Sequence, residues 1–388
     1  MQPGDDNGLA VYLHWPFVRS IPPYCDFNNF LADAVDESRW IEGLIAGFAR
    51  QAASLHDKRL LAVFIGGGMP SLLSARAIER LLRAVRAKLA TVDDLQVTME
   101  ADPEPEMVGR FADYRSAGVT RLSLRVRSLR SAGLTFMEHD RWCAADGLAA
   151  IETVTRLFPQ RSVDLFYGWP GQTLPDWLRE IDQVCGLGLD HVSIYDLEPL
   201  PGTVFAERAA AGTLTLLDDD MRAEMFIQAT EQMRACGLIP YEIANAGKPG
   251  TENRYNLHSW RGGSYIGVGP GAIGRLELGA RREATAQIHA PAAWLADIEA
   301  GGDGMAERLV LNSRERLDEL LVQSLRMAEG ITAETAARVL GGRLREHLPP
   351  ERLQSLLDDG FLIDDADGLR LTRTGWPLHE AIALRLSA

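Results

Sequence analysis

The sequence has 388 residues, of which 46% are hydrophobic, and 54 Asp and Glu against 40 Lys and Arg give a formal net charge of −14. A chain of this length can bury one large core, or a large core with a smaller companion. The acidic balance disfavours a nucleic-acid-binding protein, because phosphate neutralisation needs a basic face. No apolar run approaches the roughly 18 residues of a membrane-spanning helix, and the acidic opening residues 1–7 lack a leader pattern. We therefore expect no integral membrane segment and a cytoplasmic location.

Four cysteines are scattered along the chain, at Cys25, Cys143, Cys185 and Cys236. None of them belongs to a C-x-x-C pair, so the sequence predicts neither a disulfide framework nor a zinc ribbon. Cysteines isolated from one another in this way make a soluble cytoplasmic protein the default expectation.

Six short apolar runs, each followed by helical periodicity, occupy the first two-thirds of the chain: Leu9–Leu13, Leu60–Ile65, Leu95–Glu100, Arg121–Val126, Ser162–Tyr167 and His191–Tyr195. This alternation predicts a parallel sheet, either doubly wound or closed into a barrel, and the near-regular spacing favours a barrel or a partial barrel. In both architectures a ligand binds at the carboxyl ends of the strands. Unusual residues follow three of the runs, so we expect the site there: Gly66–Gly68 after the second, Asp102 and Pro103 after the third, and Gly168, Pro170 and Gly171 after the fifth.

The later part of the chain predicts a helix over Met221–Ala235, followed by a glycine-rich, aromatic stretch, Trp260–Gly274, that we expect to form loops over a core. Glycines in 300–304 indicate a linker. The sequence therefore predicts two domains, over residues 1–299 and 300–388.

The predicted second domain begins with an amphipathic helix marked by leucines between Leu317 and Leu325. Two further helical segments follow, and two short apolar runs flank a turn at 364–368, which is the plan of a small winged-helix-like domain. Acidic residues at Glu351, Asp358 and Asp359 would repel phosphate at the helix that reads DNA in such domains. We expect a packing module or a surface for a protein partner, and no nucleic acid.

The segment 11–30 resembles the cluster loop of radical S-adenosylmethionine proteins. More narrowly, it is similar to the branch that contains oxygen-independent coproporphyrinogen III oxidases and heme chaperones of the HemW type. In that family the loop carries C-x-x-x-C-x-x-C, whose thiolates hold a 4Fe-4S cluster with one iron open to S-adenosylmethionine. Here Val18 and Pro22 stand at the first two positions, and only Cys25 remains. Neither replacement carries a donor side chain for iron, so we do not expect the cluster.

Seven further segments are similar to family motifs in the same order along the chain: 64–73, 97–103, 164–173, 193–197, 201–205, 241–245 and 265–272. The resemblance thus covers nearly the whole chain and implies an α/β fold, a partial parallel barrel of radical-SAM type with a small winged-helix-like C-terminal domain. It assigns the cofactor contacts to Tyr12, Tyr24, Gly67, Gly68, Met69, Pro70, Glu100, Arg127, Arg141 and Asp164. Cys143 stands where this branch often has histidine, and we expect it to be a small buried side chain.

Two arginines depart from the family pattern on the run that begins at Arg121. Arg125 stands at a glycine of the family, and Arg127 stands at a glutamine that touches the cofactor. Strand alternation points both arginines into the barrel, where we expect them to pair with Glu100 and Asp164 and so close the former cofactor site. Two alternatives are that both side chains reach the barrel mouth while the cofactor still binds, or that they hold carboxylate groups of a tetrapyrrole.

The segment 255–260 is similar to a heme-contact motif proposed for the chaperone branch, with Asn256 and Trp260 kept and Tyr255 in place of its histidine. Tyr255 and His258 are both able to ligate heme iron, although ordinary packing explains such residues as well. The resemblance therefore implies a HemW-like protein. We favour a non-catalytic relative that handles heme or another tetrapyrrole, or binds a protein partner. The alternative is a functional heme chaperone or radical S-adenosylmethionine oxidoreductase with its cluster.

Overall fold

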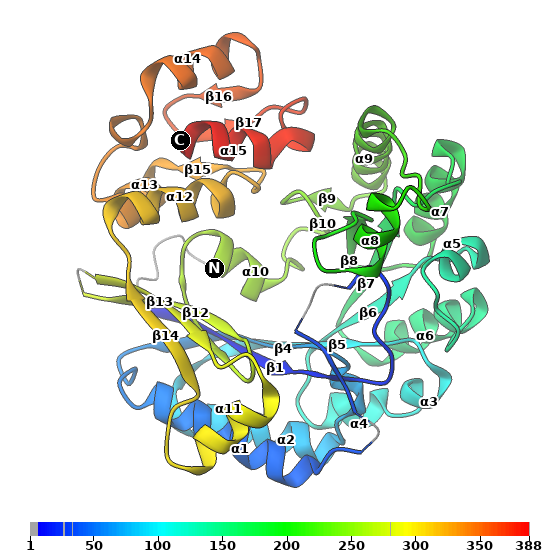
Figure 1. Ribbon diagram of the computed structural model, residues 1–388, viewed down its shortest axis with the longest axis vertical. Coiled ribbons are helices and arrows are strands. Elements are labelled where there is room, and N and C mark those ends of the chain that lie inside the picture. Colours follow the sequence, from blue (N-terminus) through cyan, green and yellow to red (C-terminus); the bar gives the residue numbers. More distant parts are fainter. Residues whose placement is uncertain (1–6, 26–27, 33, 280, 388) are drawn as a thin grey trace.

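The computed structural model describes residues 7–25, 28–32, 34–279 and 281–387 (Figure 1). The strands are β1 (Gly8–Trp15), β2 (Phe17–Val18), β3 (Phe30–Leu31), β4 (Arg59–Gly67), β5 (Ala90–Ala101), β6 (Arg121–Arg127), β7 (Gln160–Tyr167), β8 (His191–Asp196), β9 (Ile239–Pro240), β10 (Asn245–Gly247), β11 (Ser264–Val268), β12 (Ile273–Leu278), β13 (Arg281–Gln287), β14 (Met305–Val310), β15 (Ile331–Thr332), β16 (Leu362–Asp364) and β17 (Gly368–Leu371). The helices are α1 (Glu37–Ala52), α2 (Ala75–Lys88), α3 (Pro105–Val108), α4 (Phe111–Ser116), α5 (Ser131–Phe136), α6 (Ala144–Leu157), α7 (Leu174–Gly186), α8 (Val204–Ala210), α9 (Asp219–Ala235), α10 (Arg254–Trp260), α11 (Pro291–Glu299), α12 (Ser313–Ser324), α13 (Ala333–Leu340), α14 (Pro350–Asp358) and α15 (His379–Ser387).

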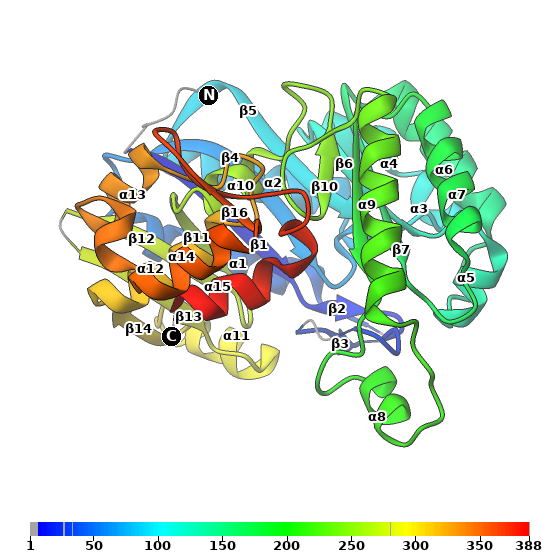
Figure 2. The same cartoon turned by 90° about the horizontal axis from the view of Figure 1, so that it is seen from above.

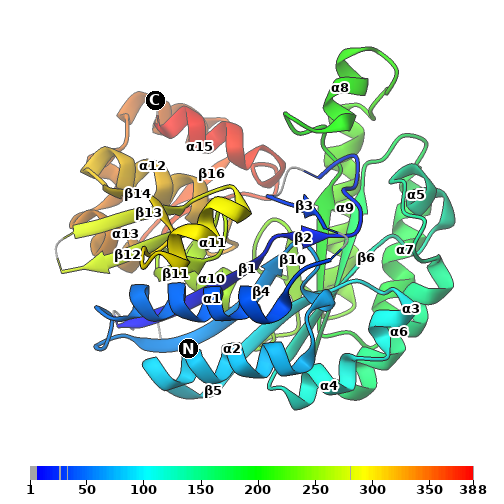
Figure 3. The same cartoon turned by 60° about the horizontal axis from the view of Figure 1, so that its bottom comes forward.

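A twelve-stranded sheet runs in the order β14-β13-β12-β11-β1-β4-β5-β6-β7-β8-β10-β9. The six apolar runs found in the sequence are β1, β4, β5, β6, β7 and β8, and each is parallel to its neighbour. Figure 3 shows helices α1, α2, α4 and α6 along the outside of this sheet. The predicted α/β fold, with a mostly parallel sheet, is confirmed.

The outer helices form where an apolar stripe meets a capping residue. Helix α2 begins after Ser74, whose side chain accepts a hydrogen bond from the backbone N–H of Ala77. Its buried face carries Ile78, Leu81 and Val85 at helical spacing, and these join the main apolar core with the outward side chains of the strands. Burying a side chain of this size stabilises the fold by about 2 kcal/mol, so the core fixes the sheet on which the site is built.

The stretch expected to form loops, Trp260–Gly274, contains a buried strand instead. Strand β11 lies parallel to β1, with Leu9 opposite Ser264 and Leu13 opposite Val268. The expectation was wrong because the strand has only five residues between glycines, and its identity depends on pairing with a distant partner. Beyond β11 the sheet continues as an antiparallel meander through β12, β13 and β14.

The large sheet extends beyond the predicted domain boundary. Residues 300–304 connect α11 to β14, and β14 pairs with β13. A separate apolar cluster begins only at Leu317. We propose that the boundary lies near Leu311, not at residue 300.

The C-terminal region follows the predicted plan of helices and a hairpin. Helices α12, α13 and α14 precede the hairpin β16–β17, and β15 completes a small antiparallel sheet in the order β15-β17-β16. Helix α15 closes the region against α12. The leucine-rich cluster between these elements is separate from the main core.

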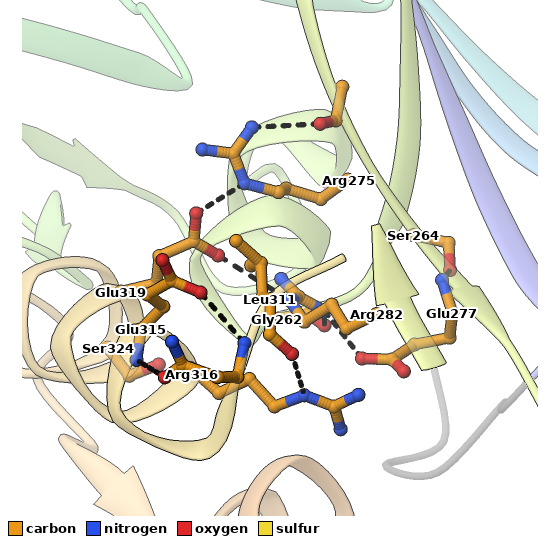
Figure 4. A network of polar contacts seen from close by, with 12 residues as sticks. Gly262, Ser264, Arg275, Glu277, Arg282, Leu311, Glu315, Arg316, Glu319 and Ser324 are labelled. Atoms are coloured by element: carbon orange, nitrogen blue, oxygen red, sulfur yellow. Dashed lines mark hydrogen bonds and ion pairs between the residues drawn. The ribbon is translucent and has the colours of Figure 1, made fainter. Parts of the chain in front are cut away.

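Ion pairs attach this region to the large sheet (Figure 4). The Arg275 Nε lies 2.5 Å from a carboxylate oxygen of Glu319 on α12, and the Arg282 Nε lies 3.5 Å from the other oxygen. The Arg282 side chain is 2% exposed and also pairs with Glu277 at 2.7 Å. A buried arginine needs such carboxylates, so this cluster ties α12 to β12 and β13.

Two cysteine expectations were wrong. Cys185 and Cys236 form a disulfide, with Cα atoms 6.1 Å apart, because α7 and α9 pack side by side and bring distant residues together (Figure 2). Cys143 is exposed at the start of α6, where its backbone N–H donates to Asp146.

Among the described residues no helix is both long and apolar enough to cross a membrane.

Candidate functional site

A cavity of about 260 Å³ lies at the carboxyl ends of the parallel strands, where the sequence placed the site. Its wall includes seven of the predicted cofactor residues, namely Tyr24, Gly68, Met69, Glu100, Arg127, Arg141 and Asp164. The three cluster positions, Val18, Pro22 and Cys25, also line it. Tyr12, Gly67 and Pro70 lie outside the lining, although Gly67 donates its N–H to Glu100 at 3.2 Å.

The glycine turn after β4 lies tightly under the cluster loop. Its backbone N–H groups donate to this loop, from Gly68 to the Trp15 carbonyl at 2.6 Å and from Met69 to the Phe17 carbonyl at 2.9 Å. A Cβ at Gly68 would lie 2.5 Å from the Phe17 carbonyl oxygen, and Gly67 has φ of +105°. Only glycine fits both positions, and the turn thereby presents its carbonyls to the cavity.

The cluster positions do not fit a 4Fe-4S cluster. Val18 is 3% exposed in β2, and Pro22 accepts a backbone hydrogen bond from Cys25 in a tight turn. The Cys25 sulfur accepts a hydrogen bond from the Asn29 amide at 3.0 Å. Three thiolates are needed, one thiol is present, and no group of three His, Cys, Asp or Glu side chains among the described residues could hold a metal ion.

Arg125 lies across the glycine turn. Its guanidinium donates to Asp102 at 2.5 Å and to the carbonyls of Gly68 at 2.5 Å and Gly67 at 3.2 Å. Glu100 lies 3.8 Å away, which agrees with the predicted pair, but the main carboxylate partner is Asp102. The Arg125 side chain is 9% exposed and that of Asp102 is 5% exposed, so the pair is buried.

Arg127 does not form the predicted ion pair. No carboxylate of the described chain lies within ion-pair distance of it, and its guanidinium carbon lies 5.5 Å from the centre of the Phe166 ring. The pairing of β6 with β7 shifts between Leu124 and Arg127, and Arg127 has φ of +70°. The simple alternation used in the sequence argument therefore fails at this residue. Asp164 instead accepts a hydrogen bond from Ser123 at 3.0 Å.

Burial controls protonation in the cavity. It raises the pKa of Glu100 to about 7, although Arg125 opposes the shift, and it raises the pKa of Asp164. Burial, helped by Arg127 and Arg125, lowers the pKa of His139 to about 3. His139 is therefore neutral near pH 7, with its Nε2 2.7 Å from the Tyr24 hydroxyl.

Several cavity residues were missed by the sequence argument. Asp102 was placed at the expected site, directly after the strand that supplies Glu100, but it was given no role. His139, Trp142 and Phe166 build an aromatic wall with Tyr24, in which the Tyr24 and Phe166 ring centres lie 5.0 Å apart. Their convergence depends on tertiary packing, and nothing in their spacing marks it.

Arg141 lies at the exposed rim of the cavity. Its Nε is 3.9 Å from Glu104, which is held more closely by Arg19 at 3.1 Å. The predicted contact with a cofactor carboxylate stays a prediction. The rim position leaves the Arg141 side chain accessible from solvent.

The two heme candidates lie on or near the buried face of α10. The Tyr255 ring packs against Phe64 and Tyr12, with ring centres 5.4 and 5.9 Å apart. The His258 Nε2 lies 2.9 Å from the Ser264 carbonyl oxygen. Neither residue lines the cavity, and heme ligation by them stays a prediction.

The partly closed parallel sheet, the glycine turn under the loop and the C-terminal region define a radical S-adenosylmethionine fold of the coproporphyrinogen III oxidase type. Residues 311–378 match the protein family described as the HemN C-terminal domain. The solved structure of coproporphyrinogen III oxidase (HemN) from Escherichia coli superposes with a TM-score of 0.81 at 17% identity, over 99% of this chain and 91% of that one. At this identity the likeness shows the fold alone.

Relatives of known name match over almost the full length. The heme chaperone HemW of Mycobacterium tuberculosis is 34% identical, over 100% of this chain and 96% of its own. The mitochondrial radical S-adenosyl methionine domain-containing protein 1 of Bos taurus is 32% identical, over 99% and 91%. The chain belongs to this HemW family of radical S-adenosylmethionine proteins, and the predicted resemblance is confirmed.

Proposed function

We propose that this chain is a non-catalytic member of the HemW family that handles heme or another tetrapyrrole without a 4Fe-4S cluster. The observation that carries the proposal is the ligand set, in which Val18 and Pro22 leave Cys25 as the one thiol of the loop. Aliphatic side chains offer no donor to iron, and one thiolate cannot hold four irons in the way three do.

S-adenosylmethionine binding is the second activity that we propose to be lost. Arg125 occupies the carbonyls of Gly67 and Gly68, and Arg127, which has no carboxylate within ion-pair distance among the described residues, adds a positive charge that would repel the sulfonium of the cofactor. The cavity of about 260 Å³ remains open, so the predicted closure by filling is only partial. S-adenosylmethionine is therefore excluded by the positive charge of the arginines and by the loss of the Gly67 and Gly68 carbonyls as acceptors, and not by lack of space. Calorimetric titration with S-adenosylmethionine should give no heat of binding, and micromolar affinity would overturn this point.

Tetrapyrrole handling is supported by the bacterial relatives named heme chaperone and by Tyr255 and His258 as candidate iron ligands. Heme titration of the purified chain, followed by the Soret absorption, tests it. A Soret shift that Tyr255→Phe or His258→Ala removes would support ligation by that residue. Saturation that neither variant changes would leave heme handling intact and reject these ligands, whereas no Soret change at all would reject heme handling.

Iron and sulfide analysis after anaerobic reconstitution decides between the two functions. We expect no sulfide bound to the native chain, and a doubly substituted Val18→Cys, Pro22→Cys chain should gain iron if the loop still has the family geometry. Near-stoichiometric sulfide in the native chain would instead support a functional heme chaperone or radical S-adenosylmethionine oxidoreductase. We also propose a cytoplasmic location, which the absence of a membrane-spanning helix among the described residues permits and against which the Cys185–Cys236 disulfide counts. Cell fractionation tests this location.

A further inference from the structure

We propose that the cavity binds an aromatic molecule with an anionic group, and that Arg127 is the residue that holds this group. The inference deepens the proposed function and rests on it, since a cluster with S-adenosylmethionine would place a cationic cofactor in the same cavity. The anionic group is a carboxylate, sulfonate or phosphate, because these accept the paired N–H donors of a guanidinium.

Arg127 is the cavity arginine without a carboxylate partner among the described residues. Asp102 is taken by Arg125 at 2.5 Å, and Asp196 by Arg222 at 2.7 Å. Asp164 accepts a hydrogen bond from Ser123, and its carboxylate and that of Glu100 act on Arg127 only from beyond ion-pair distance. The Nε of Arg127 is buried and has no hydrogen-bond partner. A half-buried cation in this condition is incompletely satisfied until an acceptor arrives.

The backbone holds Arg127 in an unfavourable conformation. Its φ of +70° belongs to the left-handed region, which arginine seldom adopts, and the strand register shifts just before it. Such conformations persist where the surrounding structure enforces them, and they cluster at binding and catalytic sites. Here the shift turns the end of β6 so that Arg127 lines the cavity over the Phe166 ring.

The rest of the wall fits a planar, apolar body. Tyr24, Trp142 and Phe166 line the cavity together with Met69 and Leu197. The Trp142 Nε1–H is buried and has no hydrogen-bond partner, so a second free donor is available beside the aromatic surface. Aromatic faces and two unsatisfied donors together favour an aromatic ligand that carries an anionic group.

The test uses two fluorescent probes of similar shape on the full chain. 8-Anilinonaphthalene-1-sulfonate carries the anionic group, and N-phenyl-1-naphthylamine lacks it. Arg127→Gln should weaken binding of the sulfonate by about tenfold or more, as expected for loss of a hydrogen bond to a charged group, and should change binding of the neutral probe less than about twofold. Arg127→Lys keeps the charge but not the paired N–H donors of the guanidinium, so its affinity for the sulfonate should lie between those of the native chain and Arg127→Gln.

Arg76→Gln is the matched control, since this exposed arginine on α2 lies outside the cavity and its loss changes the net charge equally. It should leave both affinities unchanged. Equal sulfonate affinity of the native chain and Arg127→Gln, or equal losses for both probes, would overturn the inference. Far-ultraviolet circular dichroism confirms folding of each variant. Sulfide analysis of the same samples distinguishes failure of the proposed function from failure of this inference. A bound cluster would refute the proposed function, whereas the role of Arg127 depends only on the probe affinities.

Discussion

The buried Arg125–Asp102 pair allows a sharp test of how the site is held together. Replacing Arg125 with alanine removes the guanidinium that joins β6 to the end of β5 and to the glycine turn. The Asp102 carboxylate, 5% exposed, then loses its cation, and the carbonyls of Gly67 and Gly68 lose a donor.

The expected loss of stability follows from these contacts. Removing one partner of a buried ion pair costs about 3–5 kcal/mol, because the other charge is left in a poorly solvated place. Water in the adjoining cavity can satisfy the two carbonyls, so we add nothing for them. Arg125→Ala should therefore lower the free energy of unfolding by about 4 kcal/mol. Adding Asp102→Ala removes the stranded charge, and the double variant should recover about 2 kcal/mol relative to additivity.

Urea unfolding at pH 7, followed by tryptophan fluorescence, measures the stability of the native chain, of Arg125→Ala, of Asp102→Ala and of the double variant. Arg76→Ala is the control for a surface arginine, with an expected change below about 0.5 kcal/mol. A cost below about 1 kcal/mol for Arg125→Ala, or additive single changes, would refute the reasoning that the pair is buried and mutually dependent.

Three further predictions concern protonation, the disulfide and the domain contact. Burial raises the pKa of Glu100 from 4.5 to about 7, so the folded state binds a proton that the unfolded state has released. The stability that Glu100 contributes is fully present below pH 4.5 and falls by about 3 kcal/mol as the pH rises to 7. Glu100→Gln should therefore make the free energy of unfolding in urea less dependent on pH over that range. An unchanged slope of this free energy against pH would contradict the prediction. The disulfide joins cysteines separated by 51 residues, so Cys185→Ala with Cys236→Ala should lower stability by up to about 4 kcal/mol. Reductant should act on the native chain and not on the variant, and a native chain indifferent to reductant would reject the bridge. Glu319→Ala removes an acceptor from two arginines of the sheet and should speed proteolysis near residue 311, whereas unchanged cleavage would deny the cluster a role in docking α12.

The sequence by itself determined the parallel part of the sheet and the place of the site. The six strands were readable because each is a local apolar run with helical periodicity after it, and the carboxyl ends of parallel strands meet by geometry. The replacement of two cluster thiolates was equally readable, since the chemistry of Val18 and Pro22 does not depend on their surroundings, and the loss of the cluster itself stays a prediction. The hairpin of the C-terminal region followed from two apolar runs around one turn.

Only the tertiary structure decided the partners of the buried charges. Arg125 pairs mainly with Asp102 and only more distantly with the predicted Glu100, and Arg127 lies beside a ring instead of a carboxylate. The position of Arg127 follows from a register shift that breaks the two-residue period of β6. The Cys185–Cys236 bridge depends on the packing of two helices. Contacts between residues far apart in the chain, and a single irregular backbone angle, leave no mark in local periodicity. For that reason Arg127 could be found in the sequence, while its lack of a carboxylate within ion-pair distance among the described residues emerged only from the fold.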